Sequence, residues 1–340
     1  MRRTRAVLFG SILLLALLAV PAGIAAPKKE VKIAIGPPAV VGYLPVYVAQ
    51  GLRYFQELAR RTGIQVRFLD FRGGTEAATA LITGDVDFAT VTLTHVVKAQ
   101  EKGKDLKFLL TFFNAQAMAM IVQPDVRVET PTQLQGMRIG VTSLGSATHM
   151  QARHILRYFK ANPDAAQYIA VGGPSTALAA WKRRAVDAMV YLDPLVTTLV
   201  SEGSARLFYD VRTVEGTVRL YGAPYISSGL LTRADVIVRE PRLVQEIVNV
   251  FVRTLRWLRA QRLRPEVIAG VLPKELGWTP EVIRANLSGL SADGRVLPEA
   301  VETVVRSLVD DGLLSRDFKP SFERLVDQRF VQQAILSVQQ

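Results

Sequence analysis

The segment Gln135–Leu156, with the sequence QGMRIGVTSLGSATHMQARHIL, decides the fold of this chain. Arg138–Val141 has the pattern of a buried strand, and Ala147–Phe159 carries apolar residues at the i, i+3, i+4, i+7 spacing of a helical face. The turn between them, TSLGS, consists of small residues and hydroxyls. A strand that ends in such a turn and opens a helix leaves backbone N–H groups without partners. Together with the helix dipole, these donors predict a site for an anion or a strong acceptor. The alternative is that Ser146 only caps the helix.

Composition indicates a folded protein of about two domains. The chain has 340 residues, of which 49% are hydrophobic and 21% charged, and a domain averages about 150 residues. The formal net charge is +12. However, the basic residues are mostly solitary arginines, so the sequence predicts no nucleic-acid partner. We interpret the charge as a solvated basic surface that favours anionic ligands.

The N-terminus is typical of an export signal. Met1–Arg5 is basic, Ala6–Val20 is continuously apolar, and Pro21 precedes the small-residue site Gly23-Ile24-Ala25. We therefore expect a signal peptide over residues 1–25 and a periplasmic mature protein. A retained membrane anchor over residues 6–26 is the alternative. The chain has no cysteine, so it cannot be acylated as a lipoprotein, form disulfides or use thiolate catalysis.

Short apolar strands alternate with helical patterns, which predicts an α/β fold. The chain contains an internal repeat of this pattern, which we call the internal echo: Leu69–Val91 and Ile169–Tyr191 each contain a strand, a Gly-Gly loop, an alanine-rich helix and a second strand. In open α/β sheets, ligands bind at the carboxyl ends of strands. The echo therefore predicts two lobes that face each other across a cleft and close about a hinge. The predicted crossings between the lobes are strand-like and lie near Met118–Val122 and Tyr221–Tyr225.

Several motifs in order carry a family resemblance: GYLPVYVA at 42–49, Gly73-Gly74, ALITGDVDFA at 80–89, Gly145-Ser146, and Asp193-Pro194. In this order and spacing the chain resembles the extracytoplasmic solute-binding proteins of ABC importers. The branch is the one that includes nitrate, sulfonate and taurine receptors and binders of thiamine-pyrimidine precursors.

The resemblance implies a two-lobed type II periplasmic-binding-protein fold, in which each lobe is a mostly parallel sheet flanked by helices. A two-strand hinge would join the lobes, and helices would extend the C-terminus. The expected division is residues 26–119 and 224–340 for the first lobe and 120–223 for the second. The implied ligand-binding set is Gly42, Tyr43, Gly74, Thr75, Thr90, Thr92, Asn114, Ser143, Gly145, Ser146, Thr148, Asp193 and Tyr225.

The implied function is capture of a small, anionic, sulfonate-, nitrate- or taurine-like solute for delivery to permease subunits with a cytoplasmic ATPase. The protein would be a monomer without catalytic residues or cofactor. A pyrimidine or aromatic acid is the alternative ligand, because Tyr43 and Tyr225 could stack on a ring. An enzyme of the same superfamily and a free-standing solute sensor are the alternative functions. We expect no metal site, because His149 and His154 do not share a helix face. Asp85 and Asp87 are expected to stabilise a turn.

Overall fold

The computed structural model describes residues 30–128 and 130–337 and contains two five-stranded sheets. The predicted signal peptide, residues 1–25, lies outside the described residues. The first sheet consists of β1 (Glu30–Ile35), β2 (Gln65–Asp70), β3 (Phe88–Thr92), β4 (Leu106–Thr111) and β10 (Ser228–Arg233). The second consists of β5 (Ala119–Val122), β6 (Arg138–Val141), β7 (Gln167–Ala170), β8 (Ala188–Tyr191) and β9 (Arg206–Asp210).

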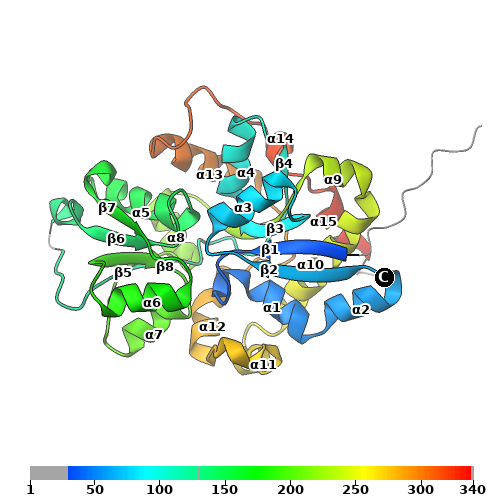
Figure 1. The fold of residues 1–340 in the computed structure, drawn as a ribbon, viewed down its shortest axis with the longest axis horizontal. Helices are drawn as coiled ribbons and strands as arrows, with labels where there is room; N and C mark the ends of the chain where they lie inside the picture. The colour runs from blue at the N-terminus through cyan, green and yellow to red at the C-terminus, as the bar shows by residue number, and fades with distance from the viewer. Residues whose placement is uncertain (1–29, 129, 338–340) are drawn as a thin grey trace, which may run out of the picture.

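The two sheets have the same topology, as the internal echo predicts. Their strand orders are β2-β1-β3-β10-β4 and β7-β6-β8-β5-β9. In each, three parallel strands are followed by an antiparallel fourth strand, which in turn pairs antiparallel with the fifth. The fourth strand of each sheet comes from the crossing segment, so the chain enters and leaves the second sheet only once. Figure 1 shows the sheets side by side, the first in blue and cyan and the second in green.

In each sheet, one aspartate links two neighbouring strands by hydrogen bonds, and the two aspartates occupy corresponding positions. The Lys32 backbone N–H donates to the Asp87 carboxylate at 2.9 Å, and the Arg138 N–H donates to Asp187 at the same distance. Both aspartate N–H groups return a hydrogen bond to the carbonyl of the same partner residue. Asp87 therefore links the start of β3 to β1, and this agrees with the structural role expected of it.

Helices cover both sheets and form most of the C-terminal part. Around the first sheet lie α1 (Leu44–Gly51), α2 (Tyr54–Thr62), α3 (Gly74–Thr83) and α4 (Leu93–Glu101). Around the second lie α5 (Ala147–Tyr158), α6 (Pro174–Lys182), α7 (Leu195–Ser201) and α8 (Val214–Tyr221). The C-terminal helices are α9 (Ala234–Arg239), α10 (Pro241–Ala260), α11 (Pro265–Val271), α12 (Pro280–Leu287), α13 (Pro298–Asp310), α14 (Phe322–Leu325) and α15 (Arg329–Ser337). Short 3-10 turns occupy Val41–Tyr43, Pro131–Leu134, Pro163–Ala165 and Lys274–Leu276.

Most predicted elements are confirmed. The residue pattern of Leu44–Leu58 is typical of one helix, but the structure has two: α1 ends at Gly51, and Arg53 adopts a left-handed backbone with φ 59°. The strand-like crossing predicted near Tyr221–Tyr225 is wrong. Tyr221 is the last residue of α8, Gly222 caps that helix with φ 76°, and the extended segment begins only at Ser228. In both places a left-handed residue stops a helix where apolar composition alone gave no signal.

We call the residues around the first sheet (30–119 and 224–337) the first lobe and those around the second (120–223) the second lobe. Helices of the C-terminal part lie above and below the junction in Figure 1, with α12 beneath it. Helix α12 contacts both α7 of the second lobe and the 3-10 turn Val41–Tyr43 of the first. Over the described residues, every helix is too short or too polar to cross a bilayer.

Candidate functional site

A small cavity lies between the carboxyl ends of the two sheets. Its volume is about 30 Å³, which leaves room for about two water molecules at roughly 10–15 Å³ each. Loops after β1, β2 and β3 line it from the first lobe, and the turn after β6 and the end of β8 line it from the second. The lining residues are Gly36, Pro37, Gly42, Tyr43, Gly74, Val91, Thr92, His95, Met118, Thr142, Ser146, Ala147, Thr148, Leu192, Ser227 and Ser228.

Three buried hydroxyls form a triangle at one wall of this cavity. Thr142 Oγ1 lies 3.0 Å from Ser146 Oγ and 2.9 Å from Thr148 Oγ1, and the last two lie 2.8 Å apart. Ser146 also caps α5, because its Oγ accepts a hydrogen bond from the His149 N–H at 3.4 Å. The predicted capping role is therefore confirmed, and the same side chain also faces the cavity.

The first turn of α5 leaves two backbone donors beside the triangle. The Met150 N–H bonds to the Ser146 carbonyl, and the Gly145 N–H donates to His149 Nδ1 at 2.9 Å. Among the described residues, the Ala147 and Thr148 N–H groups have no acceptor. Free N–H groups and the positive end of the helix dipole together favour a negative or strongly accepting group at this place.

The two lobes touch each other around the cavity. The Val41 N–H donates to the Asp193 carbonyl at 2.8 Å, and the Thr75 hydroxyl donates to the Leu144 carbonyl at 3.3 Å. The approach is close at Gly42, where an added Cβ would lie 2.9 Å from Leu192 Cδ2. A side chain at this position would therefore require the Leu192 side chain of the other lobe to shift.

His95 on α4 contributes a buried, uncharged imidazole to the cavity. Its exposed fraction is 7%, and burial, assisted by the Lys98 ammonium, lowers its pKa to about 3. Its Nε2 lies 2.9 Å from where a Cβ on Gly74 would stand, which explains why that position carries glycine. Among the described residues, the imidazole has no hydrogen-bond partner. His95 can thus donate or accept one hydrogen bond inside the cavity without carrying a charge.

Many of the sequence-predicted residues converge on this cavity or its rim. Gly42, Tyr43, Gly74, Thr92, Ser146 and Thr148 line the cavity. Thr75, Ser143 and Gly145 lie at the rim where the lobes touch. The Ser143 hydroxyl donates to Thr75 Oγ1 at 3.4 Å. A Cβ added to Gly145 would lie 4.0 Å from the same Thr75 atom. The Tyr43 ring faces the cavity, whereas its hydroxyl donates to the Gly36 carbonyl.

Asp193 lies near the cavity, but its carboxylate faces away from it. The side chain is fully buried and accepts hydrogen bonds from Arg212 Nη1 at 2.9 Å, Asn286 Nδ2 at 2.7 Å and the Thr197 N–H at 2.7 Å. Arg212 also pairs with Asp210. The Asp193 carboxylate is thus fully engaged by these donors, and because Asn286 comes from α12, Asp193 joins the second lobe to the C-terminal helices. Its neighbour Leu192 is the residue that lines the cavity.

The remaining three predicted residues also lie away from the cavity. Thr90 is buried within β3 and donates to the Ala34 carbonyl at 3.1 Å. Tyr225 packs against Tyr221, with ring centroids 4.3 Å apart, and its burial raises its pKa. Asn114 lines a separate surface depression of about 600 Å³ together with Arg259 and Arg295. The structure does not bring these three residues together with the cavity-lining set.

Several cavity residues were missed by sequence reasoning. Ser228 begins β10, and Ser227 directly precedes it; the sequence pattern did not predict this strand. His95 follows β3 directly, and the rule that ligands bind at the carboxyl ends of strands could have pointed to it. Met118 and Leu192 are apolar residues in the crossing and at the end of a strand, where nothing in the sequence separates them from core residues.

The described part of the chain contains no candidate metal site. There, no cluster of three or more His, Asp or Glu side chains is arranged to hold an ion. His149 and His154 engage different partners: His149 contacts the Tyr168 ring, and His154 stacks on Tyr221.

Comparisons with known proteins show that the fold is shared with solved structures. A solved structure from Bordetella bronchiseptica RB50 is 25% identical, with a TM-score of 0.82 over 92% of this chain and 99% of that one. The alkanesulfonate-binding protein SsuA from Xanthomonas axonopodis pv. citri, solved with MOPS, is 19% identical, with a TM-score of 0.68 over 91% of this chain and 99% of that one. The desulfurization enzyme DSZB is 15% identical, with a TM-score of 0.62 over 92% of this chain and all of that one.

The neighbours also establish the fold class, since one is described as having the generic periplasmic binding protein fold. No curated protein sequence matches this chain. The NMT1/THI5-like family model matches residues 41–261, which include both sheets' central strands and all cavity-lining residues except Gly36 and Pro37. With this match over well over half of its length, the chain belongs to the NMT1/THI5-like family.

Proposed function

We propose that this protein is the solute-binding component of an ABC importer, which captures a small anionic solute between its lobes and delivers it to a membrane permease. The observation that carries the proposal is the first turn of α5, where the Ala147 and Thr148 N–H groups and the hydroxyl triangle face a cavity between two sheets. The similarity to an alkanesulfonate-binding protein supports the same ligand class.

Each lobe contributes different residues to the proposed binding site. The first lobe supplies Gly42, Gly74 and His95, and the second lobe supplies the anion-facing turn. Hinge motion at the two crossings would open the cavity to solvent and close it over the ligand. Export through the signal peptide would place the protein in the periplasm, where it meets both the solute and the permease.

A binding role fits the groups in the cavity better than catalysis. The Ser146 hydroxyl is hydrogen-bonded to two threonines, and among the described residues no imidazole or carboxylate lies within hydrogen-bonding distance to act as its base. His149 Nδ1 already accepts from the Gly145 N–H. His95, with a pKa of about 3, is a poor proton acceptor near neutral pH. The chain has no cysteine nucleophile. The size of the cavity also favours an oxyanion over an aromatic ring.

A thermal-shift screen of residues 26–340 tests the proposal. The panel contains nitrate, methanesulfonate, taurine, longer alkyl sulfonates, aromatic carboxylates and a thiamine-pyrimidine precursor. A ligand present at about 100 times its dissociation constant should stabilise the protein by about 2.7 kcal/mol, which raises the melting temperature measurably. Stabilisation by small oxyanions supports the proposal. Stabilisation by the pyrimidine or aromatic acids alone would contradict the ligand class.

Ser146→Ala should weaken anion binding by about 1–3 kcal/mol, because it removes a hydroxyl that faces the ligand and orders its two threonine neighbours. Isothermal titration with the best ligand of the screen measures the loss. The variant also loses a helix cap, at a cost to stability of about 1 kcal/mol.

Thr213→Ala is the matched control for Ser146→Ala. Thr213 caps α8 by accepting from the Gly216 N–H at 3.0 Å and does not line the cavity. Its replacement should lower stability by a similar amount and leave affinity unchanged. Equal affinities in the two variants would show that Ser146 is only a cap.

A further inference from the structure

One face of α4 carries two basic side chains to the junction of the lobes. His95 and Lys98 lie three residues apart, so they share this face. His95 lines the cavity, and Lys98 reaches the rim, where its Nζ lies 3.6 Å from where a Cβ on Gly145 would stand. Gly145 belongs to the anion-facing turn of the second lobe and has a left-handed backbone, with φ 77°. The ammonium of one lobe therefore meets the turn that opens α5 in the other.

The Lys98 ammonium makes no hydrogen bond or ion pair in the described part of the chain, although the side chain is half-buried. Burial and then the neighbouring Lys102 lower the pKa of Lys98, and they outweigh the opposite effect of the Glu101 carboxylate. Glu101 forms no ion pair with Lys98, and it accepts a hydrogen bond from the Ser315 N–H at 2.8 Å. Lys98 is also among the causes that lower the pKa of His95 in the first lobe and of His149 in the second.

Closure thus brings like electrostatic signs together. The second lobe presents the positive end of α5 with the free N–H groups of Ala147 and Thr148, and the first lobe presents Lys98. In a partly desolvated rim this juxtaposition is unfavourable unless an anion lies between the two lobes. His95 is the unpartnered buried group that faces the same cavity, and it remains neutral, so it adds no compensating charge.

We propose that Lys98 is the charge sensor of the cleft: it opposes closure of the empty protein and favours closure around a ligand that carries a full negative charge. The inference rests on the proposed function and specifies its regulation. An anion in the cavity interacts with Lys98 from one lobe and with the N-terminus of α5 from the other. It thereby converts a repulsion between the lobes into two attractions. Neutral analogues of the same shape leave the repulsion in place, so charge selects the ligand through the hinge equilibrium.

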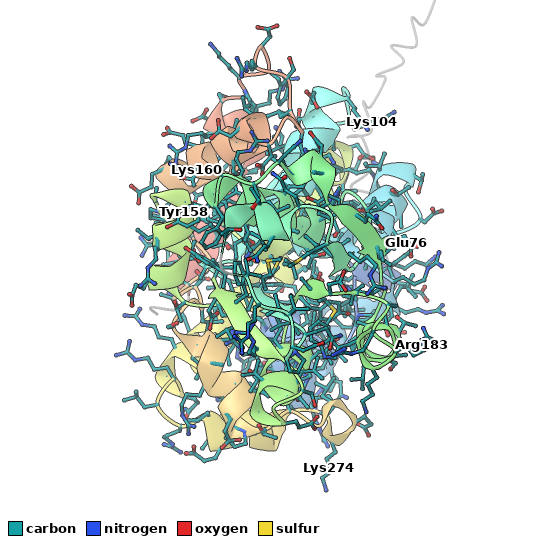
Figure 2. The ribbon with its side chains drawn as sticks, turned by 90° about the vertical axis from the view of Figure 1, so that its left-hand side faces the viewer. Glu76, Lys104, Tyr158, Lys160, Arg183 and Lys274 are labelled. Atoms are coloured by element: carbon teal, nitrogen blue, oxygen red, sulfur yellow. The ribbon has the colours of Figure 1, made fainter. Side chains whose placement is uncertain are left out.

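The test measures the distance between the lobes and the affinity for two probes. Because the chain has no cysteine, Lys104→Cys in the first lobe and Arg183→Cys in the second give a unique pair for spin labels. Both are exposed and appear at the periphery in Figure 2. Methanesulfonate is the anionic probe, and dimethyl sulfone is its neutral counterpart. Lys98→Met removes the charge, Lys98→Arg retains it, and Lys102→Met removes a charge from the exposed end of the same helix.

We expect the wild type and Lys102→Met to be open when empty and to close with methanesulfonate but not with dimethyl sulfone. Lys98→Met should populate the closed distance without a ligand and bind methanesulfonate about tenfold or more weakly, since a charge-assisted hydrogen bond is lost. Lys98→Arg should behave like the wild type.

An empty Lys98→Met protein with the same distance distribution as the wild type would overturn the inference, even if methanesulfonate does not bind. Unchanged preference for the sulfonate over the sulfone in Lys98→Met would also overturn it. If no anion of the screen binds the wild type, the proposed function fails instead, and the ligand-free distances still decide the role of Lys98.

Discussion

Replacing Asp193 with alanine is expected to lower the free energy of unfolding by about 3–5 kcal/mol, because the change removes the fully buried one of the two carboxylates that pair with the Arg212 guanidinium. Asp193 is fully buried, and the Arg212 side chain is 9% exposed. The carboxylate also satisfies Asn286 of α12 and the Thr197 N–H. The alanine variant therefore loses three hydrogen bonds and the link between the second lobe and the C-terminal helices. Urea unfolding followed by circular dichroism measures the change.

Two further variants serve as controls for the loss of stability in Asp193→Ala. Asp125→Ala removes an exposed partner of Arg184, and its expected cost is about 1 kcal/mol or less, as for other surface ion pairs. Asp193→Leu combined with Arg212→Met removes both charges, so it should recover much of the stability lost by Asp193→Ala. If Asp193 instead contacted the ligand, its replacement would reduce affinity while stability stayed near that of the wild type, and our assignment would be wrong.

Acid is expected to destabilise the protein below about pH 6.5, because the cavity keeps histidine neutral. The pKa of His95 is about 3 in the folded state, against an ordinary value of 6.5. Between these values the unfolded chain binds one proton more than the folded chain, so the free energy of unfolding falls as the pH falls. The slope from His95 alone is about 1.4 kcal/mol per pH unit in this window. His149, with a pKa of about 4, acts in the same direction.

His95→Gln provides the comparison for this pH dependence. Glutamine can donate and accept hydrogen bonds but does not titrate. The variant should lose less stability than the wild type between pH 7.5 and pH 5, whatever its stability at pH 7.5. Denaturant titrations at several pH values give both slopes. Parallel curves for the two proteins would show that His95 is accessible to protons in the folded state, contrary to its burial in the cavity.

The sequence determined those features that depend on local pattern. Arg138–Val141 forms a strand and Ala147 begins a helix, because alternation and helical spacing are properties of neighbouring residues. The internal echo predicted two equivalent sheets for the same reason. The anion-facing turn was predictable because small residues, hydroxyls and a glycine between a strand and a helix leave backbone donors free.

The tertiary structure alone decided which side chains face the cavity and which form hydrogen bonds elsewhere. Asp193 and Leu192 are adjacent in sequence, yet the carboxylate is held by Arg212 and by Asn286, 93 positions away, and the leucine lines the cavity. Likewise, only the packing of the two lobes places the Lys98 ammonium next to Gly145 of the other lobe. Such assignments depend on contacts between residues far apart in the chain, and these contacts are fixed by the packing of two lobes rather than by local residue pattern.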